Sequence, residues 1–113
     1  MTSKTIRLRE QARLDAEGAL DYYDSEAGGT VAQGFIDMLE KAYHAIGRHP
    51  AAGSLKYAHE LNLPGLRSWQ VKKYPYIIFY VDLPPHIEIW RILHAQRDIA
   101  AWMHESDGAE LEK

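Results

Sequence analysis

The sequence predicts an α+β domain in which a helical hairpin packs on a mostly antiparallel sheet. Two observations lead to this fold class. Apolar residues recur at helical spacing in two consecutive segments, 10–25 and 30–48, and the glycine-containing stretch SEAGGT separates them. Three short apolar segments with short connections follow at 66–71, 76–81 and 86–93, a pattern typical of antiparallel hairpins.

Composition excludes several classes of protein. The chain has 113 residues, of which 46% are hydrophobic and 26% charged, and its net charge of −3 argues against bulk nucleic-acid binding. It has no cysteine, so disulfides and thiolate metal sites are excluded. No apolar run reaches the roughly 18 residues that span a membrane, and the N-terminal MTSKTIRLRE lacks an apolar signal core. We therefore expect a cytoplasmic protein without membrane contact.

The N-terminal half is expected to form a strand and two helices. Residues 5–9 alternate apolar and charged side chains, which predicts a short strand before the first helix. Thr30 and Gln33 have the Thr-x-x-Gln spacing of a capping box, which predicts the start of the second helix. That helix should end near Arg48, because Pro50 disfavours its continuation.

The C-terminal half is expected to hold the sheet. Residues 49–65 contain prolines and glycines and predict a loop. The continuous apolar run at 76–81 predicts a central strand covered on both faces. The next strand should alternate, with Ile87, Ile89, Arg91 and Leu93 on one face. A short helix should follow at 96–104. We expect residues 1–104 to form a single domain and the acidic residues 105–113 a flexible tail.

Several of these segments carry recognisable motifs in a fixed order. They are FIDMLEKAYHAI, a loop with HP followed by glycine, GLRSWQV, YPYIIFYV and IEIWRILHAQRD, and with the first strand and helix they span residues 5–103. This ordered set resembles the toxin subunits of bacterial ParD–ParE pairs, in the RelE/ParE superfamily. The resemblance implies the fold order β-α-α-β-β-β-α and the toxin half of a type II toxin–antitoxin system.

The resemblance also implies a target and a partner. ParE-like members act on DNA gyrase, whereas RelE-like relatives cut messenger RNA on the ribosome, and a fold alone does not choose between them. A ParD-like antitoxin would neutralise the toxin in a hetero-oligomer and carry the DNA binding, so we expect no specific DNA contact by this chain. Antitoxin-binding candidates at the border of the apolar stripes are Leu14, Leu20 and Met38.

RNA cleavage requires a base for the 2′-hydroxyl and cations for the phosphate. Arg67 and Arg91 are the candidate phosphate cations and His94 the candidate base. No tyrosine follows the last strand, since the final one is Tyr80, so the set of RelE-like nucleases is incomplete. We therefore expect a non-enzymatic gyrase inhibitor that needs no cofactor. Two alternatives stay open: an endoribonuclease, and a non-toxic member that binds only its antitoxin.

Binding a target requires exposed anchors rather than catalytic groups, and aromatic residues and arginine dominate interface energies. The candidates for target binding are Arg67, Trp90, Arg91, Arg97 and Trp102. Trp69 and Trp102 also fit simple packing roles. Asp98 fits the start of the last helix. No metal site is expected, because His44 and His49 lie five residues apart and no histidine pair has i, i+4 spacing beside a carboxylate.

Overall fold

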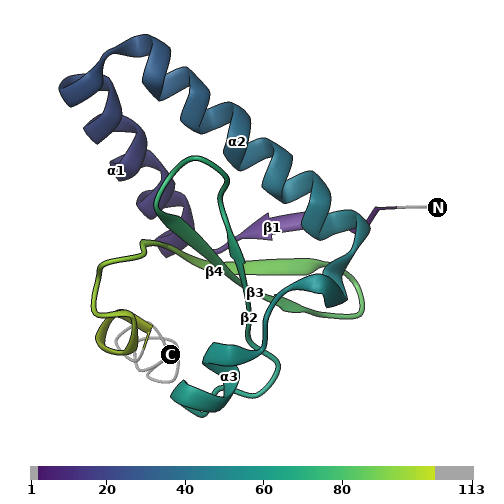
Figure 1. The fold of residues 1–113 in the computed structure, drawn as a ribbon. Coiled ribbons are helices and arrows are strands. Elements are labelled where there is room, and N and C mark those ends of the chain that lie inside the picture. The colour runs from purple at the N-terminus through teal and green to yellow at the C-terminus, as the bar shows by residue number, and fades with distance from the viewer. Residues whose placement is uncertain (1–2, 104–113) are drawn as a thin grey trace.

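The computed structural model describes residues 3–103, and within them a four-stranded sheet carries helices on both faces (Figure 1). In chain order the elements are β1 (Ile6–Leu8), α1 (Glu10–Ala27), α2 (Gly29–Arg48), the 3₁₀ turn η1 (Pro50–Ala52), α3 (Lys56–Leu61), β2 (Arg67–Gln70), β3 (Tyr76–Asp82) and β4 (Ile87–His94). Residues 99–103 are helical. The α+β class and the expected order are confirmed.

The sheet is mostly antiparallel, as expected, with strand order β1-β4-β3-β2. β2 pairs with β3 and β3 with β4 in antiparallel register. β1 pairs with β4 in parallel, with Ile6 opposite Ile87 and Leu8 opposite Ile89. The first strand of the chain therefore closes the sheet beside the last one and leaves β1 and β2 at its two edges.

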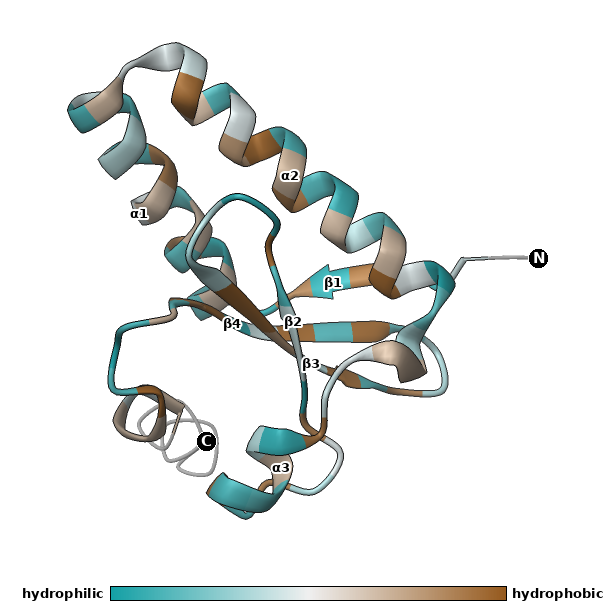
Figure 2. Cartoon of the chain, in the orientation of Figure 1, coloured by the Kyte–Doolittle hydropathy of each residue, from teal (hydrophilic) through white to brown (hydrophobic). Residues whose placement is uncertain are grey.

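The two long helices differ from the prediction where they meet. α2 begins at Gly29, and its N-cap is Gly28, whose φ of 92° is a backbone conformation that glycine adopts without strain. The predicted capping box is wrong, because this tight turn places Thr30 already inside the helix. Gln33 instead donates to the Asp37 carboxylate at 3.2 Å. Figure 2 shows apolar and polar residues alternating along α2, the pattern from which this helix was predicted.

The segment expected to be a loop, 49–65, contains η1 and α3 (Figure 1). Ser54 Oγ accepts a hydrogen bond from the amide of Lys56 at 3.1 Å, and Asn62 ends α3 in the left-handed conformation. Six residues are too few to show helical periodicity, which explains why the sequence pattern missed this helix.

Two apolar clusters cover the two faces of the sheet. The larger one fills the space between the α1–α2 hairpin and the sheet and includes Phe35, Ile46, Ile78, Tyr80, Ile89 and Ile92. The smaller one lies on the opposite face with α3 and residues 99–103, and includes Leu61, Leu66, Phe79, Leu93 and Met103. Neighbouring residues of β3 contribute to opposite clusters, so the predicted two-sided burial of the central strand is confirmed.

β4 changes face part-way along its length. Phe79 lies opposite Arg91 whereas Tyr80 lies opposite Ile89, so Trp90 is an extra residue in a β-bulge. Ile89 consequently packs toward the helical hairpin, while Leu93 packs on the other face. The prediction that Ile87, Ile89, Arg91 and Leu93 share one face is wrong for this reason.

The tip of the β2–β3 hairpin is fastened to α2. Tyr74 Oη donates to the carbonyl of Val31 at 3.0 Å. A Cβ at Gly34 would lie 2.5 Å from the same oxygen, so the helix needs glycine where the hairpin crosses it. This contact holds the hairpin against the helices.

The last helix begins at residue 99, later than the predicted residue 96. Residues 95–98 form a turn, and Asp98 Oδ1 accepts a hydrogen bond from the amide of Ala101 at 3.1 Å, which confirms its capping role. The predicted tail at 105–113 lies outside the described residues. Among residues 3–103, no helix is long and apolar enough to cross a bilayer.

Candidate functional site

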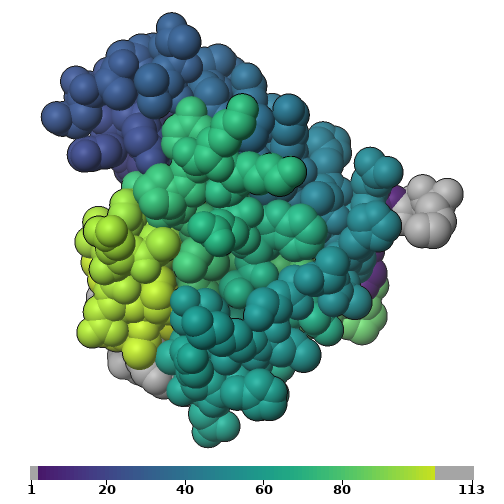
Figure 3. All heavy atoms as spheres, in the orientation of Figure 1, coloured from purple at the N-terminus to yellow at the C-terminus, as the bar shows by residue number. Residues whose placement is uncertain are grey.

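A groove with a volume of about 540 Å³ lies between α1 and the end of β4. We call it the α1 groove. Figure 3 shows the two segments that border it, with α1 in purple above the last described residues in yellow-green. It is lined by Leu14, Asp15, Gly18, Ala19, Tyr22, Tyr23, Tyr76, Ile92, Leu93, His94, Arg97 and Trp102. Four of the predicted site residues therefore come together here: Leu14, His94, Arg97 and Trp102.

A buried ion pair forms one wall of the groove. Asp15 accepts hydrogen bonds from Arg91 Nε at 2.8 Å and from Arg91 Nη2 at 2.9 Å. It also accepts the amide of Ile92 at 3.0 Å, which lies on the β4 edge beyond the end of β1. Arg91 Nη1 further donates to the carbonyl of Trp102 at 3.2 Å. The carboxylate thus closes the sheet edge that β1 leaves open.

Arg91, a candidate phosphate cation and target contact, is buried in this network. The residue is only 3% exposed, and Asp15 neutralises its charge in a bidentate pair. Sequence alone does not pair Asp15 with Arg91, because 76 residues separate them. One of the two candidate cations for RNA cleavage is thus already paired with a carboxylate.

Two guanidinium groups lie near the ring of Trp102. The Arg91 guanidinium carbon lies 5.3 Å from the tryptophan ring and that of Arg97 lies 4.8 Å from it. Trp102 also packs on the smaller apolar cluster and is half-buried, as the packing interpretation expects. Arg97 is exposed, so the rim of the groove presents a cation stacked on an aromatic ring.

His94 lies at the same end of the groove. Its ring meets Tyr76 edge to face, with centroids 5.2 Å apart, and its Nδ1 accepts a hydrogen bond from the amide of Gln96 at 3.1 Å. Burial raises the pKa of Tyr76, so its phenol stays protonated near neutral pH. These contacts give His94 a structural role at the turn that follows β4.

Arg67 and Trp90 lie outside the groove. Arg67 Nη1 donates to the carbonyls of Ala51 at 3.0 Å and Gly53 at 2.8 Å, which fastens η1 to β2. Trp90 is half-buried under the Arg9 guanidinium, 4.1 Å from its ring, and donates to Glu88 at 3.3 Å. Neither residue lines the surface on which the other target-binding candidates meet.

The antitoxin-binding candidates divide between two surfaces. Leu14 is 45% exposed in the α1 groove, whereas Leu20 packs partly on the core. Met38 lines a second groove of about 220 Å³ with Lys41, Ala42, Ala45, Trp69, Gln70 and Lys72, which we call the α2 groove. Tyr22, which is 59% exposed at the α1 groove, was not among the predicted residues. Its position outside the apolar stripe of the helix is the sequence signal that would have indicated an exposed aromatic side chain.

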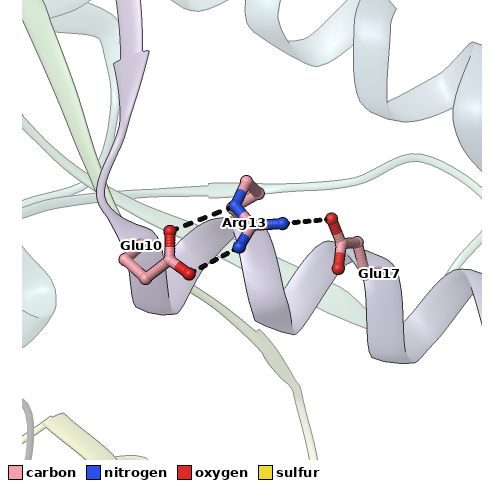
Figure 4. A network of polar contacts seen from close by, with 3 residues as sticks. All are labelled: Glu10, Arg13 and Glu17. Atoms are coloured by element: carbon pink, nitrogen blue, oxygen red, sulfur yellow. Dashed lines mark hydrogen bonds and ion pairs between the residues drawn. The ribbon is translucent and has the colours of Figure 1, made fainter.

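The first half of α1 carries paired charges on its exposed face. Arg13 bonds both Glu10 and Glu17, one helical turn to either side (Figure 4). The hydrogen bond to Arg13 lowers the pKa of Glu10. This network supports the helix that positions Asp15, and it leaves aromatic rings and Arg97 as the distinctive chemistry of the groove.

Comparison with known proteins identifies the family of this chain. A family model described as the ParE toxin of type II toxin–antitoxin system, parDE, matches residues 6–99. This chain belongs to the ParE toxin family. A solved structure described as the chromosomal ParDE TA system from P. aeruginosa is similar with a TM-score of 0.70 and 17% sequence identity, covering 83% of this chain and 98% of that one. No curated protein matches the chain.

Membership in the ParE family makes the chain the toxin of a type II toxin–antitoxin system. An antitoxin partner follows from that membership. In this ParE-family chain, Asp15, Arg91 and the carbonyl of Trp102 form one connected hydrogen-bond network beside the groove.

Proposed function

We propose that this ParE-family toxin inhibits DNA gyrase by binding it and that a ParD-like antitoxin neutralises the toxin. The toxin acts in the cytoplasm, where gyrase meets DNA. The observation that carries the proposal is the burial of Arg91 against Asp15, which supports binding over cleavage. A guanidinium already paired with a carboxylate offers little charge to a phosphate.

The rim of the α1 groove is the proposed gyrase contact. Arg97 and Tyr22 are exposed there, and the Trp102 ring contacts the guanidinium groups of Arg91 and Arg97. Exposed arginine and aromatic side chains on a rigid frame are the usual anchors of protein interfaces. Leu14 adds an apolar surface beside them.

A supercoiling assay with purified gyrase tests the proposal. The wild-type chain should inhibit supercoiling and accumulate cleaved DNA. Arg97→Glu should weaken inhibition about tenfold, since it reverses a charge at the rim. Lys56→Glu, the same charge reversal on exposed α3 outside the groove, is the matched control and should inhibit as the wild type does.

Three outcomes would contradict gyrase inhibition. Message cleavage in a translation extract that His94→Ala abolishes would establish the endoribonuclease instead. Normal growth on expression of the chain alone would establish a member that binds its antitoxin without toxicity. Growth arrest without any effect on supercoiling would also exclude gyrase as the target.

A further inference from the structure

The three tryptophans of this chain differ in their surroundings. Trp90 and Trp102 both meet arginine side chains, with guanidinium carbons between 4.1 and 5.3 Å from the ring centroids. Trp69 has no cation or second aromatic ring against it among residues 3–103. It is half-buried and lines the α2 groove. The exposed part of Trp69 therefore lies at a concave surface and has no stacking partner within the described chain.

The rim of the α2 groove carries cations. Lys41 of α2 and Lys72, in the turn after β2, both line the groove and are exposed, and the next residue, Lys73, is exposed as well. Among the described residues, none of these three lysines forms an ion pair. Asp37, one helical turn before Lys41, accepts a hydrogen bond from Gln33 at 3.2 Å. The lysines therefore keep their charge for an external anion.

The overall charge of −3 conceals this basic side of the molecule. The segment between Glu60 and Asp82, which includes β2 and most of β3, contains no acidic residue but holds Arg67, Lys72 and Lys73. The carboxylates concentrate instead on α1, at Glu10, Asp15, Glu17, Asp21, Asp24 and Glu26. The turn between β2 and β3 lies against α2 (Figure 1), so its lysines and Lys41 add to one local positive field.

An aromatic ring beside lysines is the chemistry that binds unpaired nucleotides. Bases stack on aromatic rings while cations hold the phosphates, and neither contact requires a particular sequence. Gln70 also lines the groove and is exposed, so its amide is placed to bond the edge of a base. The groove volume of about 220 Å³ is below the roughly 300–1,000 Å³ of pockets that enclose a whole small molecule. A single planar base suits this space better than a larger ligand.

From these observations we propose that the α2 groove holds an unpaired base at a strand end of the DNA that gyrase has cut. The base stacks on Trp69, and the phosphates on either side of it contact Lys41 and Lys72. A strand end held in this way is withheld from rejoining, so cleaved DNA accumulates. The contact is independent of sequence and needs no specific DNA binding. This inference rests on the proposed function, which supplies the cut DNA.

Titration of the purified chain into a fluorescent DNA single strand of about ten nucleotides tests the contact without gyrase. Anisotropy should show tighter binding of the single strand than of a blunt duplex with the same sequence. Trp69→Leu should weaken binding about tenfold, because the base loses its stacking partner. Trp90→Leu, a tryptophan change outside the groove, is the matched control and should bind as the wild type does. Thermal unfolding establishes that both variants are folded.

The lysines are tested by charge reversal at exposed positions, where the fold should survive. Lys41→Glu and Lys72→Glu should each weaken binding of the single strand, whereas Lys56→Glu, the same change on exposed α3 outside the groove, should not. Two phosphate contacts predict a slope of about −1.4 for the logarithm of affinity against the logarithm of salt concentration, and Lys72→Gln should reduce its magnitude by about 0.7. In the gyrase reaction, Lys72→Glu should leave less cleaved DNA than the wild type.

The outcomes separate the two proposals. A wild-type chain that binds the single strand through Trp69 and Lys72 but does not inhibit gyrase overturns the proposed function and leaves the groove contact standing. A chain that inhibits gyrase, with folded Trp69→Leu and Lys72→Glu binding DNA as the wild type does, overturns only the groove inference. Tighter binding of an RNA strand with the same sequence would overturn DNA as the occupant. If Lys41→Glu and Lys72→Glu abolish antitoxin binding and leave DNA binding unchanged, the groove belongs to the antitoxin and the inference is also overturned.

Discussion

Asp15 of α1 neutralises Arg91 of β4 where the parallel strand β1 stops short of the end of β4. The carboxylate makes a bidentate pair with the guanidinium and accepts the amide of Ile92 at 3.0 Å. One side chain thus replaces the strand that the sheet lacks at this point, and it fixes the wall of the α1 groove.

Removing the charge of Asp15 should be costly. Asp15→Asn leaves the Arg91 guanidinium buried without a counter-charge, so the free energy of unfolding should fall by about 3 kcal/mol. Urea denaturation measures this difference. Glu17→Gln, on the exposed face of the same helix, should change the value by less than about 0.5 kcal/mol. Equal stabilities for the two variants would show that the pair does not hold α1 to β4.

Two glycines in the helical hairpin should respond to alanine in opposite directions. Gly18→Ala has open space around its new methyl group and should stabilise α1 by about 0.5–1 kcal/mol. Gly34→Ala places a methyl group 2.5 Å from Tyr74 Oη, so the hairpin tip must move and the protein should be destabilised. Thermal unfolding of the two variants gives the sign of each change, and a Gly34→Ala variant that is as stable as the wild type would refute the close contact.

Tyr80 should control the order of the η1 turn. Its hydroxyl donates to the carbonyl of Pro50 at 2.8 Å and accepts the amide of Gly53 at 3.1 Å. Tyr80→Phe leaves both backbone groups without this partner and should cost about 1–3 kcal/mol. Amide exchange at Gly53 should accelerate. Tyr76→Phe, whose hydroxyl has no hydrogen bond among the described residues, serves as control and should leave Gly53 unaffected.

Tyr43 should tolerate the loss of its hydroxyl. That oxygen is buried and has no hydrogen-bond partner within the described part of the chain. Tyr43→Phe removes an unsatisfied polar group, so the free energy of unfolding should stay the same or rise by up to about 1 kcal/mol. A loss of more than that in a denaturant titration would indicate a partner for the hydroxyl.

Alkaline pH should destabilise the fold through its tyrosines. Burial raises the pKa of Tyr43, Tyr76 and Tyr80 above the usual tyrosine value. The unfolded chain therefore loses protons before the folded chain does, so this contribution to stability is complete below about pH 10 and declines as pH rises through the folded pKa values. Unfolding measured from pH 8 to 11 should show the decline, and Tyr43→Phe should reduce its slope.

The elements whose apolar residues follow a clear pattern in the sequence were predictable. The apolar stripe of α2 and the continuous apolar run of β3 depend only on neighbouring residues and their burial. The bulge at Trp90 was not predictable, since an extra residue in β4 is defined only by its register against β3. α3 was missed because Ser54 and Asn62, rather than a periodic pattern, set its ends.

The candidate site was predictable only in part. Residues near each other in sequence, such as His94, Arg97 and Trp102, could be grouped, and they do line one groove. The burial of Arg91 could not be predicted, because its partner Asp15 lies on α1, 76 residues earlier in the sequence. A local sequence pattern does not predict which charged residues pair when they lie far apart in the chain.

The parallel pairing of β1 with β4 also sets when this protein can become a toxin. Ile6 leaves the ribosome early, whereas Ile87, its partner, is synthesised near the end of the chain. Since translation proceeds from the N-terminus, a nascent chain that stops before β4 has neither a complete sheet nor Arg91 to engage Asp15. Harmful activity is therefore postponed until synthesis is almost finished, and truncated products of the gene should be innocuous to the cell that makes them.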